Sequence, residues 1–224
     1  MQQVSKPYQR PNSKRANRRL LLLAVLSLIS VITLGGLYKD QVRASEARAI
    51  QVASINSWQG GSFPVENFQA YTSGFGYRRS ATGGAGWELH RGLDIAAPEG
   101  SYIRSWWTGQ VIELSDHTAC GTSIKIQSGE WTHVYCHMKG HVETAEGRRY
   151  LIDRSGGLQI WEGQRVPSGA RIGRVGMTGR TTGPHLHWGM KYANQYVDPA
   201  LVLRAMYNQQ SNSGAVAKYK NQRD

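Results

Sequence analysis

Short runs of β-branched and aromatic residues, separated by glycine and proline, dominate the chain from Phe63 to about Leu203. They read GQVIEL, TSIKIQ, WTHVYCH, ARIGRVG and HLHWGMKY. No stretch in this region repeats its apolar residues with the helical period of about 3.6 residues. The pattern therefore predicts a mainly β domain of short antiparallel strands over residues 63–203.

A continuous apolar segment precedes this domain. Residues 20–38, LLLLAVLSLISVITLGGLY, contain no charge across 19 positions. As a helix they would cover about 28 Å, close to the hydrocarbon thickness of a bilayer. Segment 1–19 is a basic arm with six Lys or Arg residues and no acid, and the positive-inside rule places it in the cytoplasm. We expect a single-pass transmembrane signal-anchor in the cytoplasmic (inner) membrane, with all later residues on the exported, periplasmic or extracellular side.

The alternative is a signal peptide cleaved near Val42-Arg43-Ala44. The apolar run is longer than the roughly 7–15 residues usual for a signal-peptide core, which favours the anchor. Residues 39–62 are polar, end in QGGS, and are predicted to be a linker. Residues 204–224 are polar at their end, show no apolar face, and are predicted to be a disordered tail.

The net charge of +12 is concentrated at the two ends of the chain. The basic arm carries +6 and the segment 204–224 carries +3, which leaves +3 for everything between. No aromatic–basic recognition module is present, so the charge does not indicate a nucleic-acid partner.

Two cysteines flank a predicted hairpin formed by TSIKIQ (122–127) and WTHVYCH (131–137) around Ser128-Gly129. This arrangement brings Cys120 within about two strand positions of Cys136, which permits a disulfide. In an exported protein a disulfide is favoured, and closing a loop of about 15 residues stabilises by up to about 3 kcal/mol. The alternative is a pair of buried free thiols.

Histidine and aspartate residues in three segments suit a catalytic metal site. In a strand, His185 and His187 point to the same side because side chains alternate. Asp94, four residues after His90, lies in the apolar run LDIAAP, where an unneutralised carboxylate is costly to bury. His137 ends WTHVYCH, whose alternation places residues 131, 133, 135 and 137 on one polar-aromatic face, expected to be the floor of a substrate groove. A catalytic zinc takes three such ligands and leaves a position for water.

These motifs together resemble the lysostaphin/LytM-type zinc metallopeptidases, which cut peptide bonds in peptidoglycan. The matching segments are TSGFGYR (72–78), HRGLDIAAPEG (90–100), VYCHM (134–138), RIGRVGMTGRTTGPHLHWG (171–189) and VDP (197–199). The resemblance implies a sandwich-like antiparallel β-sheet domain with a groove over Zn²⁺. It implies three zinc ligands, His90, Asp94 and His187, and two catalytic histidines that handle protons, His137 and His185.

The implied function is a zinc endopeptidase that remodels the cell wall, with a peptidoglycan peptide as substrate. The alternative is a non-catalytic wall-binding or amidase-activating adaptor of the same fold, but such members lack one or more of the five residues. Two features depart from the family pattern: the cysteine pair, and an insertion of about twenty residues within 139–165. Because unregulated wall hydrolysis is harmful, we expect control by a regulatory protein or by this insertion, which could wall or cover the groove.

Overall fold

The computed structural model describes residues 58–80 and 86–220, with side chains as far as residue 212. The predicted basic arm, the segment 20–38 and most of the linker lie outside the described residues. Among the described helices, none has the length and hydropathy needed to cross a membrane.

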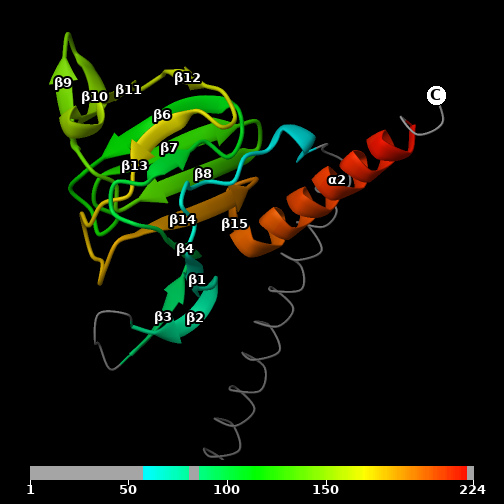
Figure 1. Ribbon diagram of the computed structural model, residues 1–224. Coiled ribbons are helices and arrows are strands. Elements are labelled where there is room, and N and C mark those ends of the chain that lie inside the picture. Colours follow the sequence, from blue (N-terminus) through cyan, green and yellow to red (C-terminus); the bar gives the residue numbers. More distant parts are fainter. Residues whose placement is uncertain (1–57, 81–85, 221–224) are drawn as a thin grey trace, which may run out of the picture. The chain divides into compact units, whose positions relative to one another are not determined.

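The main sheet confirms the predicted mainly antiparallel β architecture (Figure 1). Within the described ranges it has eight strands. Seven follow one path: β1 (Ala70–Ser73), β4 (Gly92–Ala96), β14 (His185–Tyr192), β8 (Trp131–Cys136), β7 (Ser123–Ser128), β6 (Gly109–Ser115) and β12 (Arg165–Val166). The eighth, β15 (Gln195–Val197), pairs with the end of β14 that lies beyond β4. The central strands β4, β14 and β8 are therefore held from both sides.

Three smaller sheets complete the fold of the described residues. They are β2 (Gly76–Arg79) with β3 (Trp87–His90), β5 (Tyr102–Arg104) with β13 (Arg171–Arg174), and the meander β9 (His141–Ala145), β10 (Arg148–Asp153) and β11 (Leu158–Trp161). A 3-10 turn, η2 (Arg154–Gly156), connects β10 to β11. Figure 1 shows the meander at one corner of the molecule, beside β6, and β2–β3 at the opposite end. The meander is the predicted insertion.

The predicted hairpin of β7 and β8 forms, with Ser128 opposite Trp131 and Gln127 opposite Thr132. Gly129 at φ 61° and Glu130 make the two-residue turn. A positive φ at the first turn position suits glycine, because it lacks the Cβ that would clash there.

The C-terminal segment differs from the predicted disordered tail, because α2 runs from Pro199 to Lys220. Its start has a clear local cause: the Asp198 carboxylate accepts from the backbone N–H of Ala200, and proline follows the cap. Val202, Leu203 and Met206 are buried in the core. A short apolar stripe at the helix start is thus enough to dock it.

The domain also begins earlier than the predicted boundary at residue 63. The 3-10 turn η1 (Trp58–Gly60) lies within the predicted linker, and the Trp58 side chain is 2% exposed. The Gln209 side chain on α2 accepts from the Trp58 backbone N–H at 2.8 Å, and the Gln210 amide donates to the Gly61 carbonyl at 2.9 Å. The beginning of the domain and the terminal helix therefore hold each other.

The face of β8 predicted to be a groove floor is instead part of the core. Trp131, His133 and Tyr135 are all buried, and His133 is fully enclosed. His133 bridges the Ser128 hydroxyl at 2.8 Å and the Tyr135 hydroxyl at 2.7 Å, so both its ring nitrogens have partners. Burial lowers the pKa of His133 to about 3 and keeps the ring neutral.

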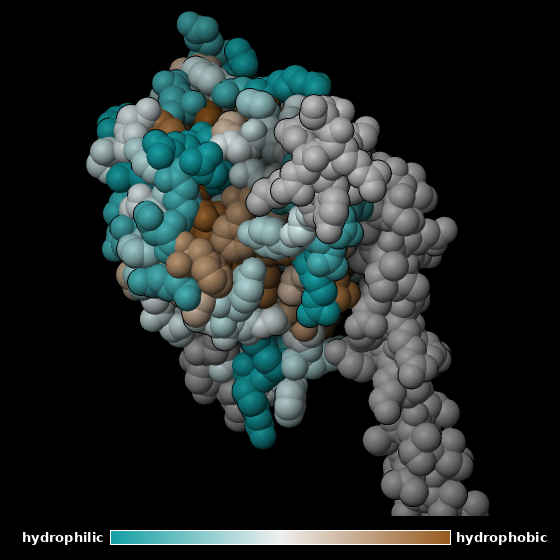
Figure 2. Space-filling model, turned by 45° about the vertical axis from the view of Figure 1, so that its right-hand side comes forward, coloured by the Kyte–Doolittle hydropathy of each residue, from teal (hydrophilic) through white to brown (hydrophobic). Residues whose placement is uncertain are grey.

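Figure 2 shows hydrophobic residues gathered in the middle of one face of the molecule, with hydrophilic residues around them.

Candidate metal centre

The register of three neighbouring strands builds the centre. On β14, His187 lies opposite Asp94 of β4 on one side and opposite Cys136 of β8 on the other. Directly paired residues share a face of a sheet, so these three side chains project from the same face. Leu186 and Trp188, the neighbours of His187, are fully buried in the core on the other face.

Three side-chain atoms converge above this row, as the sequence predicts for its zinc ligands. Nδ1 of His187 lies 2.8 Å from Oδ1 of Asp94, and Nε2 of His90 lies 3.0 Å from the same oxygen. The two ring nitrogens are 2.9 Å apart. His90 comes from the end of β3, so β3, β4 and β14 each supply one atom. Two imidazoles and one carboxylate match the ligand set of a catalytic zinc site.

The protonation of these groups supports a cation between them. Nδ1 of His90 lies 2.6 Å from the carbonyl oxygen of Gly74, which can only accept, so this nitrogen carries the hydrogen. In the neutral ring, Nε2 then presents a lone pair toward Asp94. Lone pairs of two groups that face each other at this distance repel unless a cation lies between them. The residues present therefore fit a zinc ion.

Asp94 is held in its ionised form. Burial by itself would raise the pKa of this carboxyl, but positive charge beside it, from a protonated His187 or His90 ring or from a cation between the three groups, outweighs burial and lowers the pKa below its usual range. Oδ2, the oxygen that does not face the histidines, accepts from Nη1 of Arg78 at 2.8 Å. Such a partner fixes the orientation of a metal-binding carboxylate. The sequence motifs did not single out Arg78, although it lies within the matching segment TSGFGYR.

Gly92 explains why HRGLD has glycine at its centre. A Cβ atom there would lie 2.7 Å from Cε1 of His187 and 2.7 Å from the backbone oxygen of Trp188. Atoms in real proteins do not approach a Cβ that closely, so the His187 ring occupies the space that glycine leaves. Any side chain at position 92 would displace a predicted ligand.

His137 reaches the centre by leaving its strand. Strict alternation would place it with Tyr135 on the core face, but β8 ends at Cys136 and His137 has φ 60°. A positive φ is uncommon for a residue other than glycine, and it turns the ring to the metal side. There it is 4.8 Å from the His185 ring and 6.0 Å from the His187 ring, centroid to centroid.

Both predicted proton-handling histidines have a fixed tautomer. The carbonyl oxygen of Thr178 lies 2.8 Å from Nδ1 of His137, and that of Gly183 lies 2.8 Å from Nδ1 of His185. Each Nδ1 therefore carries the hydrogen, and each neutral ring keeps an unprotonated Nε2. Burial lowers the pKa of His137 to about 4. Nε2 of His185 lies 3.7 Å from Oδ1 of Asp94, so His185 borders the ligand cluster without joining it.

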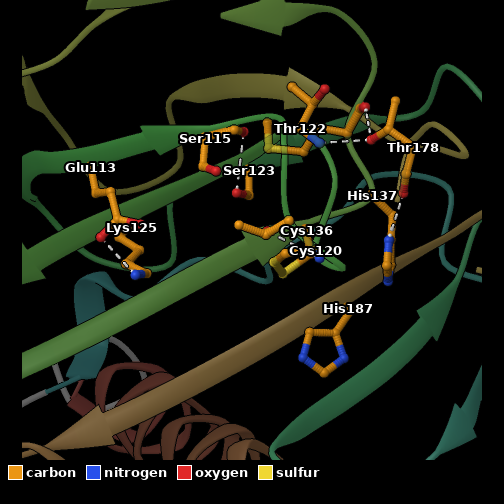
Figure 3. Close-up of a disulfide and its surroundings, with 12 residues drawn as sticks. Glu113, Ser115, Cys120, Thr122, Ser123, Lys125, Cys136, His137, Thr178 and His187 are labelled. Atoms are coloured by element: carbon orange, nitrogen blue, oxygen red, sulfur yellow. Dashed lines mark hydrogen bonds and ion pairs between the residues drawn. A yellow bond between two sulfur atoms is a disulfide. The ribbon is translucent and has the colours of Figure 1, made fainter. Parts of the chain in front are cut away.

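A disulfide between Cys120 and Cys136 adjoins His137, as predicted (Figure 3). The backbone N–H of His137 donates to the carbonyl of Cys120 at 2.8 Å. The Thr178 hydroxyl donates to the Met138 carbonyl at 2.9 Å and accepts from the Thr122 N–H at 2.8 Å. The disulfide and these bonds together hold the loop that contains His137 against the turn that orients its ring.

A cavity of about 170 Å³ opens onto the centre. Its lining contains four of the five predicted site residues, Asp94, His137, His185 and His187. Its described walls also hold Arg78, Glu88, Arg180 and four hydroxyl residues, Thr72, Ser73, Thr181 and Thr182. No residue of the meander lines this cavity. Within the described part of the chain, the insertion therefore does not cover the centre, contrary to the expectation from the sequence.

Comparison with known proteins agrees with this geometry. The sequence model described as peptidase family M23 matches residues 88–199, half of the chain, and includes all five predicted site residues. A similar protein is the DD-carboxypeptidase/endopeptidase Mpg of Neisseria meningitidis, 31% identical over 145 residues, which are 63% of this chain and 29% of Mpg. Another is the peptidoglycan DD-endopeptidase ShyB of Vibrio cholerae, 30% identical over 137 residues, which are 61% of this chain and 28% of ShyB.

Among solved structures, a zinc-containing peptidase from Vibrio cholerae is 29% identical with a TM-score of 0.49, covering 62% of this chain and 38% of that one. The matched part of the chain spans less than a third of the length of Mpg and of ShyB. The family match covers His90 at the end of β3, the strands β4, β8 and β14, and the loops that orient His137 and His185. By this match and by the five residues it contains, the chain belongs to peptidase family M23.

Proposed function

We propose that this protein is a zinc-dependent endopeptidase that hydrolyses peptide bonds in peptidoglycan. The observation that carries the proposal is the convergence of His90, Asp94 and His187 to within 3.0 Å of one another beside two further histidines with unprotonated nitrogens. Relatives of similar sequence are named as peptidoglycan endopeptidases, which supports this substrate class.

The three converging atoms would hold the zinc: Nε2 of His90, Oδ1 of Asp94 and Nδ1 of His187. When bound, zinc supplies Lewis-acid chemistry, which lowers the pKa of water and polarises a carbonyl group. Arg78 and the Gly74 carbonyl orient two of the ligands from behind.

His137 and His185 would move the protons of the reaction. Each ring presents Nε2 as the acceptor for a proton from the attacking water, because Nδ1 is committed to a backbone carbonyl. A ring that has taken up this proton becomes a donor, and it can then stabilise the developing oxyanion or protonate the leaving amine. The low pKa of His137 keeps its ring neutral, and therefore able to accept, at physiological pH.

The adaptor alternative lacks a supporting observation. An adaptor has no need for a buried carboxylate between two imidazoles, a costly arrangement without a metal. Here all five residues are present and meet in one place.

Digestion of purified peptidoglycan by the detergent-solubilised, zinc-loaded full-length chain tests the proposal. Mass spectrometry of the products should show new amino and carboxyl ends within the crosslinked peptides. Zinc-loaded His185→Ala serves as the matched control and should release almost nothing. Absence of cleavage by the wild-type protein would contradict the proposal, and release of single terminal residues alone would indicate a carboxypeptidase instead.

We also propose that segment 20–38 anchors the protein in the cytoplasmic membrane with the peptidase domain on the exported side. The support is the uncharged apolar run and its basic flank. The full-length protein should stay in the membrane fraction after a carbonate wash, with its domain accessible to protease added from the exported side. A soluble exported form that begins near Ser45 would show a cleaved signal instead.

A further inference from the structure

Two cavities flank the metal residues, and their walls differ chemically. We call the cavity described above, with Thr72, Ser73, Thr181 and Thr182 in its walls, the hydroxyl cavity. A second cavity of about 350 Å³ shares Arg78, Glu88, His137, Arg180 and His187 with it. This arginine cavity adds Leu89, His90, Arg91, Ala119, Cys120 and Cys136. Because Arg78 and Arg180 line both cavities, the walls differ by the four hydroxyl residues of the first and by the additional arginine, Arg91, of the second.

The arginine cavity carries an excess of positive charge. Its walls contain Arg78, Arg91 and Arg180 against one acid, Glu88. Arg180 contacts Glu88 at 3.0 Å, and Arg78 contacts Asp94 at 2.8 Å and Glu88 at 3.4 Å. Glu88, the one carboxylate in these walls, is therefore already paired with two of the three arginines.

Arg91 is the cation left over. Among the residues that the structure describes, no carboxylate pairs with it. Its guanidinium lies over the Tyr196 ring, 5.3 Å from the centroid, and the side chain is exposed. Stacking of this kind holds a guanidinium in place while leaving its N–H donors free for a planar anion.

The backbone around Arg91 fixes its distance from the reaction. Arg91 stands between His90, a predicted zinc ligand, and Gly92, which packs against the ring of His187. Its Cα therefore cannot shift without moving the metal centre. A substrate group bound by Arg91 would therefore lie in the cavity that His90 and His187 also line.

We propose that the arginine cavity is a subsite for a substrate residue that bears a free carboxylate, and that Arg91 is its specificity-determining residue. The inference rests on the proposed peptidase function and adds to it a preferred charge on one side of the cut bond. Arg180, whose side chain is exposed, stays paired with Glu88 and adds positive charge to the same wall. The carboxylate comes from a peptide side chain or from a chain end, two sources that share one chemistry.

Four versions of one crosslinked peptide distinguish these sources: both carboxylates free, the side-chain carboxylate amidated, the chain-end carboxylate amidated, and both amidated. Cleavage of each by the zinc-loaded full-length chain in detergent gives kcat and KM. Amidation of the carboxylate that occupies the subsite should raise KM about fivefold, as expected for loss of one partly exposed ion pair, with little change in kcat. Amidation of the other carboxylate should have no effect.

Arg91→Gln should bring the KM ratio between the free and the amidated peptide close to one. Arg91→Lys should keep part of the discrimination, because lysine keeps the positive charge but cannot form a bidentate hydrogen bond to a carboxylate. Lys191→Gln is the matched control: Lys191 also lies over the Tyr196 ring, at 4.7 Å, but does not line the cavity. This variant should discriminate like the wild type. Raised salt should reduce the discrimination of the wild type and leave that of Arg91→Gln unchanged.

The outcomes separate this inference from the function on which it rests. Absence of cleavage of every peptide would overturn the proposed function. Equal KM values for all four peptides with the wild-type protein would overturn the subsite and leave the peptidase function standing. Discrimination that persists in Arg91→Gln, with normal zinc content and thermal unfolding, would likewise overturn the role of Arg91.

Discussion

His187 and Asp94 lie directly opposite each other on β14 and β4, with Nδ1 of the histidine 2.8 Å from Oδ1 of the aspartate. Their spacing is therefore set by sheet register and by backbone hydrogen bonds on both sides of β14, rather than by a loop. A slip of one residue would move one of the two to the core face. Central strands hold site residues more rigidly than loops do, which suits a metal site.

The different roles of the two histidines on β14, His187 as a zinc ligand and His185 as a proton-transfer group, are testable. His187→Ala should abolish stoichiometric zinc binding, because it removes one of three ligands. His185→Ala should keep about one zinc per chain and lose activity by about 10²–10⁴-fold, as expected for a proton-transfer group. Metal content by atomic absorption and turnover at saturating zinc measure both. The division would be wrong if His185→Ala lost zinc as completely as His187→Ala.

Arg78 should support metal binding without touching the metal. Arg78→Gln removes the donor that orients Asp94, and we expect zinc affinity to fall about 10–100-fold. Arg79→Gln is the matched control, since Arg79 is the next residue and lies over the Trp87 ring instead. Competition with a chelator measures the affinity of each variant. Equal affinities in the two variants would show that the contact with Asp94 has no such role.

The disulfide should matter for activity as well as for stability. Cys120→Ser with Cys136→Ser should lower the free energy of unfolding by up to about 3 kcal/mol. It should also lower kcat about 10–100-fold with zinc retained, because the loop that positions His137 is released. If the domain is exported as proposed, denatured, unreduced protein should show no free thiol. Full activity of the double variant would restrict the disulfide to a stabilising role.

A buried ion pair attaches the meander to the domain. The Asp153 carboxylate, 3% exposed, accepts from Nε of Arg174 at 2.6 Å and from Nη2 at 2.8 Å. We expect Asp153→Asn to lower the free energy of unfolding by about 2 kcal/mol at neutral pH, because Arg174 keeps its charge without an ionised partner. Denaturant unfolding measures the difference.

The difference in free energy of unfolding between the wild type and Asp153→Asn should depend on pH, because it follows the ionisation of Asp153. The hydrogen bonds from Arg174 lower this pKa in the folded state below its unfolded value of about 3.9. The stabilisation is therefore present above about pH 4 and disappears as the pH falls through the lower, folded-state pKa. Glu143→Gln, which breaks an exposed cluster in the same meander, is the control and should change stability little. A difference between wild type and Asp153→Asn that persisted at strongly acidic pH would contradict the assignment.

The strand pattern and the presence of a metal site follow from the order of the amino acids alone, whereas the division into zinc ligands and proton-handling histidines rests on the family resemblance. Alternation has a period of two, so the shared face of His185 and His187 follows from their spacing. The cost of an unpaired carboxylate within the apolar run LDIAAP likewise indicates a partner for Asp94. Both arguments depend on local geometry or composition, which the sequence carries directly.

The faces that are covered, and the turns that break the pattern, depend on tertiary packing. His133 and Tyr135 lie in the core because other residues, Trp106 among them, pack over that face of β8. His137 does not point to that face, because its backbone is left-handed. Backbone hydrogen bonds to Cys120 and Gly176, both far away along the chain, hold this conformation. The terminal helix is ordered because its short apolar stripe has a partner in the domain. Burial and strain depend on what packs against a segment, and that information lies in residues far away along the chain.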